Sequence, residues 1–109
     1  MSKKDAIYFE TTDPSDRTVV LHESSWEHIT DGHPEMTDPN EVKATIQNPN
    51  VITQQTDRGS LIYSKSGRSI PYVNVVAKMD DTYSKGVVKT AYVSTKLPKG
   101  KTIWMRKST

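Results

Sequence analysis

Two of the three histidines, His28 and His33, lie five residues apart in the chain, and Glu35 follows closely. Imidazole is the side chain that most readily takes up or releases a proton near neutral pH. The two histidines lack the i, i+4 spacing that would put two metal ligands on one helical face, and no fourth ligand is close in sequence. We therefore interpret His28 and His33 as an acid–base pair. The alternative is structural: His28 would stabilise the C-terminal end of a helix, and Trp26 would belong to the core.

A second group of side chains that could transfer protons or stabilise charge lies in the second half of the chain. It comprises Tyr63, Lys78, Thr90 and Tyr92. Charge is also unevenly distributed, because all 13 acidic residues fall within residues 1–84, whereas residues 85–109 carry seven lysines and arginines and no acid. This basic segment is either a solvated strand edge and tail or a surface that binds phosphate.

The composition excludes several classes of chemistry. The chain has 109 residues, which fits one domain, and no cysteine, which excludes disulfides, thiolate zinc sites, iron–sulfur clusters and a cysteine nucleophile. No phosphate loop, dinucleotide fingerprint, nucleophile elbow or metalloprotease motif is present, so we expect neither a metal nor a cofactor. No apolar run reaches the ~18–20 residues of a membrane span and no signal-peptide pattern is found, which predicts a cytoplasmic protein that does not enter a membrane.

The proton-transfer groups and the basic segment together suit cleavage of RNA without a metal ion. The substrate itself supplies the nucleophile, the ribose 2′-hydroxyl. The protein then needs only to remove that proton, protonate the leaving 5′-oxygen and stabilise charge on the phosphorane. Under this hypothesis His28 and His33 exchange the protons, and Lys78 stabilises the developing charge. Thr90 and Tyr92 would position the scissile phosphate.

Two short helices should lie between the first predicted strand and the others. The stretch Ser24-Ser-Trp-Glu27 has the spacing of a capping box and predicts a helix of barely two turns that ends near Gly32. Asp38 followed by Pro39 predicts the start of a second helix, which stops before residues 48–50. Residues 1–17 are expected to form a loose N-terminal segment that contributes little to stability, and residues 18–109 a single domain.

Apolar side chains recur at every second position over most of the remaining chain, which predicts strands. The expected strands are Thr18–His22, Val51–Gln55, Leu61–Ser64, Pro71–Lys78, Gly86–Ser94 and Lys101–Met105. Turn-rich pieces of hairpin length, such as residues 57–60 and 66–68, separate the last five, which predicts an antiparallel sheet. In strand 86–94, Lys89 interrupts one row of side chains, and Thr90, Tyr92 and Ser94 make the other row polar. The sequence therefore leaves open which of the two rows is buried.

Short motifs follow one another along residues 22–104 in a fixed order. They are Trp26-x-His28-Ile29, His33-Pro34-Glu35, Asn48-Pro49-Asn50-Val51, Ile62-Tyr63, Tyr72-Val73-x-Val75-Val76, Val88-x-Thr90-Ala91-Tyr92 and Lys99-Gly100-x-x-Ile103-Trp104. In this order and spacing the chain resembles the phage-type barnase/EndoU/colicin/RelE-like nuclease domains. The resemblance implies an α+β fold, with short N-terminal helices packed on a twisted antiparallel sheet of about four strands. It also implies a metal-independent endoribonuclease of a phage, toxin or mobile element, with RNA and a cognate antitoxin or immunity protein as partners.

The resemblance also implies roles for individual residues. The helical motif matches at His28 and at His33 to Glu35, the hairpin aromatic matches at Tyr63, where it would stack a base, and the polar row matches at Thr90 and Tyr92. The candidate substrate contacts are Glu35, Tyr63, Lys65, Lys96, Lys99 and Lys101.

The chain departs from the family pattern at two places. Gly32 stands where many relatives have arginine. Where they have a basic residue directly after two aromatic residues, this chain has Ser64 and then Lys65. Two further classes therefore stay open: a catalytically silent RNA- or protein-binding domain on the same fold, and a phage interaction or structural protein whose basic tail contacts an acidic partner.

Overall fold

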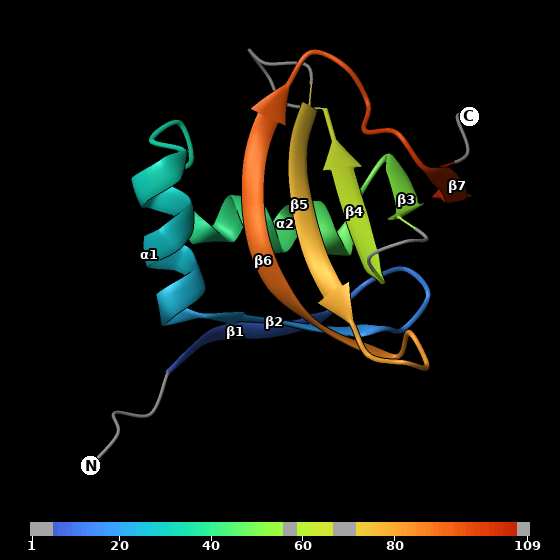
Figure 1. Cartoon of the computed structure of the whole chain (residues 1–109), viewed down its shortest axis with the longest axis horizontal. Coiled ribbons are helices and arrows are strands. Elements are labelled where there is room, and N and C mark those ends of the chain that lie inside the picture. The colour runs from blue at the N-terminus through green and yellow to red at the C-terminus, as the bar shows by residue number, and fades with distance from the viewer. Residues whose placement is uncertain (1–5, 56–58, 67–71, 107–109) are drawn as a thin grey trace.

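The computed structural model describes residues 6–55, 59–66 and 72–106, which contain seven strands and two helices (Figure 1). The strands are β1 (Ile7–Thr12), β2 (Thr18–His22), β3 (Val51–Gln55), β4 (Ser60–Lys65), β5 (Tyr72–Met79), β6 (Lys85–Ser94) and β7 (Lys101–Met105), and the helices are α1 (Glu23–Gly32) and α2 (Pro39–Gln47). The strands predicted from residue 18 onward are all present, with ends that agree to within one residue. Of the predicted turns and strand ends, residues 57, 58, 67, 68 and 71 lie outside the described residues.

All seven strands form one sheet, in the order β1-β2-β6-β5-β4-β3-β7. Neighbouring strands are antiparallel except β2 and β6, which pair in parallel between residues 18–20 and 85–87. The predicted fold of short N-terminal helices on an antiparallel sheet of about four strands is therefore wrong, because the sheet is mixed, has seven strands and makes the protein mostly β. Hairpin spacing predicts only pairs that are adjacent along the chain, whereas β2 and β6 are far apart in sequence.

Helix α2 covers one face of the sheet and lies behind β4, β5 and β6 in Figure 1. Its start follows the sequence prediction: the Asp38 carboxylate accepts a hydrogen bond from the N–H of Asn40 at 2.9 Å, and Pro39 occupies the first turn. Val42 and Ile46, one helical turn apart, are fully buried in the core. The core therefore lies between α2 and the sheet, and the opposite face is open where it carries Lys78 and Lys89, whereas Ile62, Ser64 and Asn74 on the same face are buried.

Helix α1 lies beside β6, and the two run in the same direction (Figure 1). It spans ten residues, more than the two turns predicted, and His22 rather than Ser24 occupies the N-cap position. Ile29 is its buried residue, so most of the helix surface stays available to solvent or ligand. Because β2 pairs only with residues 85–87 of β6, the later part of that β6 edge is next to α1 instead of another strand.

A β-bulge in β6 decides which of its side chains face the core. Thr90 pairs with Val76, but Val88 pairs with Ala77, so Lys89 is an extra residue in the ladder. The extra residue shifts the alternation of side chains, which lets Val88 be fully buried while Lys89 is exposed. The polar row that begins at Thr90 therefore lies on the open face.

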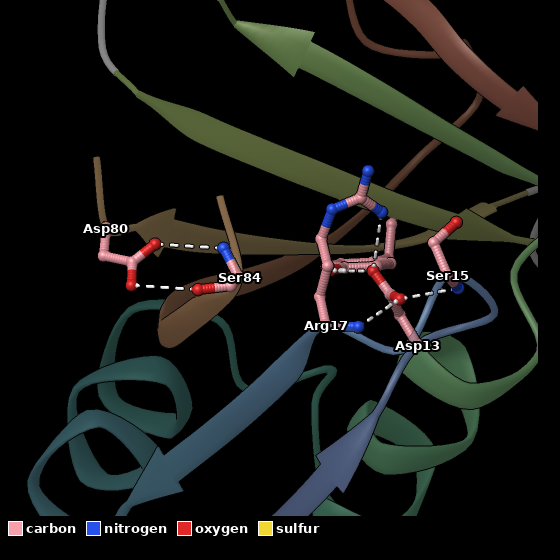
Figure 2. A network of polar contacts seen from close by, with 6 residues as sticks. Asp13, Ser15, Arg17, Asp80 and Ser84 are labelled. Atoms are coloured by element: carbon pink, nitrogen blue, oxygen red, sulfur yellow. Dashed lines mark hydrogen bonds and ion pairs between the residues drawn. The ribbon is translucent and has the colours of Figure 1, made fainter. Parts of the chain in front are cut away.

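The end of the N-terminal segment is held in the structure by a buried carboxylate. Residues 7–12 form β1, which pairs with β2, and Asp13 directly after it is only 4% exposed. Its carboxylate accepts hydrogen bonds from the N–H groups of Ser15 and Arg17 at 2.8 and 3.0 Å, and from the Arg17 guanidinium at 3.0 Å (Figure 2). The Tyr63 hydroxyl donates to the same carboxylate at 2.8 Å. The segment is thus paired with β2 and tied to β4, whereas the sequence predicts a loose segment.

Candidate active site on the open face of the sheet

The open face of the sheet carries a groove beside α1, which we call the central groove. It has a volume of about 590 Å³ and is lined by His28, Gln55, Ser60, Val76, Lys78, Lys89 and Thr90. The strand register explains how residues distant in sequence meet there. Lys78 pairs with Ser60 and Ser60 pairs with Gln55, so the three side chains share one face of the sheet.

The central groove favours an anionic ligand. The exposed side chains of Lys78 and Lys89 line it, and none of its described lining residues carries a carboxylate. His28 adds a group that becomes positive when protonated. Cationic groups gathered in one groove raise the local concentration of anions, such as the phosphates of a nucleic acid.

The second histidine lies further along β6, next to the central groove. The His33 ring packs against the Tyr92 ring with centroids 6.1 Å apart, and its Nδ1 lies 3.4 Å from Oε2 of Glu35. Burial raises the pKa of Tyr92, so its hydroxyl stays protonated and can donate a hydrogen bond. The surface beside the groove therefore combines a hydrogen-bond donor with a proton-transfer group.

The two histidines lie opposite successive positions of the polar row. Thr90 and Tyr92 are two residues apart on β6, which separates them by about 7 Å. His28 lies in α1, and His33 directly follows the last residue of that helix. Since α1 runs beside β6, His28 borders the groove at Thr90 while His33 packs on Tyr92. The two histidines therefore border the polar row at different positions.

The structural alternative for this stretch holds for Trp26 but not for His28. Trp26 is partly buried and packs against the core. His28 lies in the middle of α1, whose last turn contains no basic residue, so it does not stabilise the C-terminal end of the helix.

Tyr63 does not belong to the groove, and its predicted role in stacking a base is wrong. Its side chain is fully buried with the core residues, and its hydroxyl donates to Asp13. Burial first, and then this hydrogen bond, raise the pKa of Tyr63 far above its usual value. A ring that solvent cannot reach on either side has no face to offer a base.

We expect Tyr63→Phe to lower stability. The change removes one hydrogen bond to a buried carboxylate, which should cost about 1–3 kcal/mol of unfolding free energy. Urea denaturation measures this loss. An unchanged free energy of unfolding would show that the Tyr63 hydroxyl does not stabilise the fold through Asp13.

Four of the other predicted substrate contacts lie outside the central groove. Lys65 pairs with Val73, a core residue, so its side chain belongs to the face that α2 covers. Lys101 lies on the edge strand β7, opposite Gln54, while Lys96 and Lys99 are exposed on the connection between β6 and β7. The basic segment therefore supplies the central groove with Lys89.

Sequence reasoning missed Gln55, Ser60 and Lys89 as lining residues. Hairpin register could have found Gln55 and Ser60 once Lys78 was placed, because it fixes the cross-strand partners. Lys89 is read from the sequence as an interruption of an apolar row, whereas it marks a bulge. Bulges are over-represented next to active sites, where they redirect a side chain.

A chain of hydrogen bonds fixes the three strands beside Tyr92. Ser64 Oγ donates to Asn74 Oδ1 at 2.7 Å, and Asn74 Nδ2 donates to Ser94 Oγ at 2.8 Å. Ser94 Oγ in turn donates to the backbone carbonyl of Lys96 at 2.6 Å. Because Asn74 is the cross-strand partner of Tyr92, this chain holds the end of the polar row in place.

Within the part of the chain that the structure describes, no three His, Asp or Glu side chains are grouped as a metal site requires. Among the same residues, neither helix has the length and apolar character that would let it cross a membrane. Comparisons with known protein families, with curated proteins and with solved structures found no significant match.

Proposed function

We propose that this protein is an endoribonuclease that cleaves RNA without a metal ion. The observation that carries the proposal is the meeting of His28, Lys78 and Thr90 in one cationic groove, with the His33 and Tyr92 rings in contact beside it. The residues come from a helix and two strands, and each type matches a requirement of phosphodiester cleavage by an internal hydroxyl.

The proposed reaction is an internal transfer of the phosphodiester. One imidazole takes the proton of the ribose 2′-hydroxyl, and the 2′-oxygen forms a bond to phosphorus. The bond between phosphorus and the 5′-oxygen breaks, and the other imidazole gives that oxygen a proton. The products are a 2′,3′-cyclic phosphate and a 5′-hydroxyl.

The remaining groups would act on the phosphate. Lys78 and Lys89 offset the extra negative charge of the phosphorane, and the hydroxyls of Thr90 and Tyr92 donate hydrogen bonds to its oxygens. Lysine binds phosphate as a point charge. Lys78 and Lys89 can therefore supply the positive charge that an arginine at position 32 would carry, but not its paired hydrogen bonds. Glu35, next to His33, would orient that imidazole.

Incubation of the purified protein with total RNA in EDTA tests the proposal. Cleavage in EDTA that disappears in His28→Ala supports a metal-independent ribonuclease. RNA that is bound but left intact would instead indicate the catalytically silent RNA-binding domain.

The salt dependence of RNA binding should identify the lysines that contact phosphate. Each phosphate contact on single-stranded RNA contributes about −0.7 to the slope of log K against log salt. The double variant Lys78→Gln, Lys89→Gln should therefore flatten the slope by about 1.4 for a non-cleavable 2′-O-methyl oligonucleotide. The control variant Lys65→Gln, Lys101→Gln removes the same charge away from the groove and should leave the slope nearly unchanged. Equal effects of the two variants would mean that RNA does not bind in the central groove.

A further inference from the structure

The central groove continues along the open face toward β1. A row of directly paired residues crosses the sheet: Gln55, Ser60, Lys78, Val87, Val20 and Glu10, on β3, β4, β5, β6, β2 and β1 respectively. Direct cross-strand partners share one face, so these six side chains form a continuous floor. Lys78 stands at its middle and also lines a second pocket of about 610 Å³, which we call the distal pocket.

The distal pocket differs chemically from the central groove. Its floor is apolar at Val20 and Val87, and Val87 is 41% exposed. Cations and carboxylates are balanced among its lining residues, which include Lys78, Lys85, Glu10 and Asp80. Because its two lysines are balanced by two carboxylates around an apolar floor, the pocket does not favour phosphate. It suits an uncharged flat group with polar edges.

Only one of the two carboxylates is available to a ligand. Asp80 holds the turn between β5 and β6, because its carboxylate accepts hydrogen bonds from the N–H of Ser84 at 3.0 Å and from the Ser84 hydroxyl at 3.3 Å (Figure 2). These contacts, the backbone one first, lower the pKa of Asp80. The Glu10 carboxylate, by contrast, makes no hydrogen bond or ion pair with the residues that the structure describes, and Glu10 stands at the far end of the floor.

We propose that the distal pocket is a nucleobase subsite, which binds the base next to the phosphate held in the central groove. The identity of the ligand as RNA rests on the proposed function. The base would lie on Val87 and Val20, which follow Lys78 at one and two strand spacings, or about 5 and 10 Å. Its edge would then face the Glu10 carboxylate.

Glu10 gives the subsite a preference among bases. An ionised carboxylate only accepts hydrogen bonds, so it attracts the amino groups of adenine, cytosine and guanine. Uracil has no amino group, and carbonyl oxygens flank its single N–H. The subsite therefore selects bases that carry an amino group and disfavours uracil.

Binding of hexanucleotides that cannot be cleaved tests this selectivity. The probes are 2′-O-methyl oligouridine and three variants in which one internal uracil is replaced by adenine, cytosine or guanine. The wild-type protein should bind at least one amino-bearing probe about tenfold more tightly than oligouridine, the scale of one charge-assisted hydrogen bond. Glu10→Gln should reduce this preference below about twofold, because an amide can also donate to the uracil carbonyls.

Val87→Thr tests the floor, because it keeps the β-branched shape but replaces a methyl by a hydroxyl. It should weaken binding of all four probes several-fold. Leu97→Thr is the matched control, since Leu97 is also 41% exposed but lies on the connection between β6 and β7. That control should bind like the wild-type protein.

Two results would overturn the subsite: equal affinity of the wild-type protein for the four probes, or a preference that survives in Glu10→Gln. The subsite and the proposed activity can fail separately. A protein that cleaves RNA in EDTA without discriminating the probes loses the subsite and keeps the activity. A protein that discriminates the probes but cleaves no RNA loses the activity and keeps the subsite.

Discussion

Replacing His28 or His33 by alanine should lower the rate of RNA cleavage by about 10²–10⁴-fold, the range for a lost proton-transfer group. The melting temperature should change little, because His28 is exposed, His33 is only half-buried, and the helix packs through Ile29. Initial rates on a fluorescent oligoribonucleotide measure the first effect, and thermal unfolding measures the second. The wild-type pH–rate profile should be bell-shaped, since one imidazole must be neutral and the other protonated, and each variant should lose one limb.

Asp31→Ala is the matched control for the two histidine variants. Asp31 is an exposed residue of the same helix and does not line the central groove. It should retain the wild-type rate and pH profile. Folded His28→Ala and His33→Ala proteins that cleave RNA at the wild-type rate would remove both histidines from the mechanism.

The second large effect is expected on stability, at Asp13. Asp13→Ala removes a buried carboxylate that four hydrogen bonds use, and it leaves the Tyr63 hydroxyl buried without that acceptor. Breaking a buried charged pair typically costs about 3–5 kcal/mol. Small domains have a total stability of about 5–15 kcal/mol, so the melting temperature should fall by more than about 10 °C.

Comparing the denaturation of Asp13→Ala with that of Ser15→Ala distinguishes the hydrogen bonds to the Asp13 carboxylate from effects on the turn alone. Ser15 contributes only its backbone N–H to Asp13, and that group survives the substitution. Ser15→Ala should therefore stay close to the wild-type stability. A loss of less than about 1 kcal/mol in Asp13→Ala would show that the N-terminal segment is not held by this carboxylate.

Local sequence signals were sufficient for most of the individual elements. Asp38 and Pro39 mark the start of α2, and apolar or β-branched residues at every second position between turn-rich pieces mark β3 to β7. The β1 strand is harder to recognise, since Ile7 and Tyr8 are exposed at the sheet edge and give no buried row. The parallel pairing of β2 with β6 has no local signal, because it depends on the tertiary path of the chain between them.

The sequence predicts the chemistry of the candidate site but only some of the residues that form it. The residue types of His28, Lys78 and Thr90 indicate the chemistry, and the positions of α1 and β5 beside β6 bring the three together. Tyr63 was misassigned because β4 is buried on both faces, so its alternation does not reveal which side chains face the core. The bulge at Lys89 likewise cannot be distinguished from a break in the pattern until the register with β5 is known.

Cleavage of a matched pair of oligoribonucleotides in EDTA tests the central claim most directly. The second member of the pair carries a single 2′-deoxyribose on the 5′ side of the bond that is cut in the first. The account predicts that the wild-type protein cuts the all-ribose strand to a 2′,3′-cyclic phosphate and a 5′-hydroxyl, and leaves the same bond intact in the deoxy strand. Equal cleavage of both strands at that bond, or cleavage that requires a divalent ion, would contradict it.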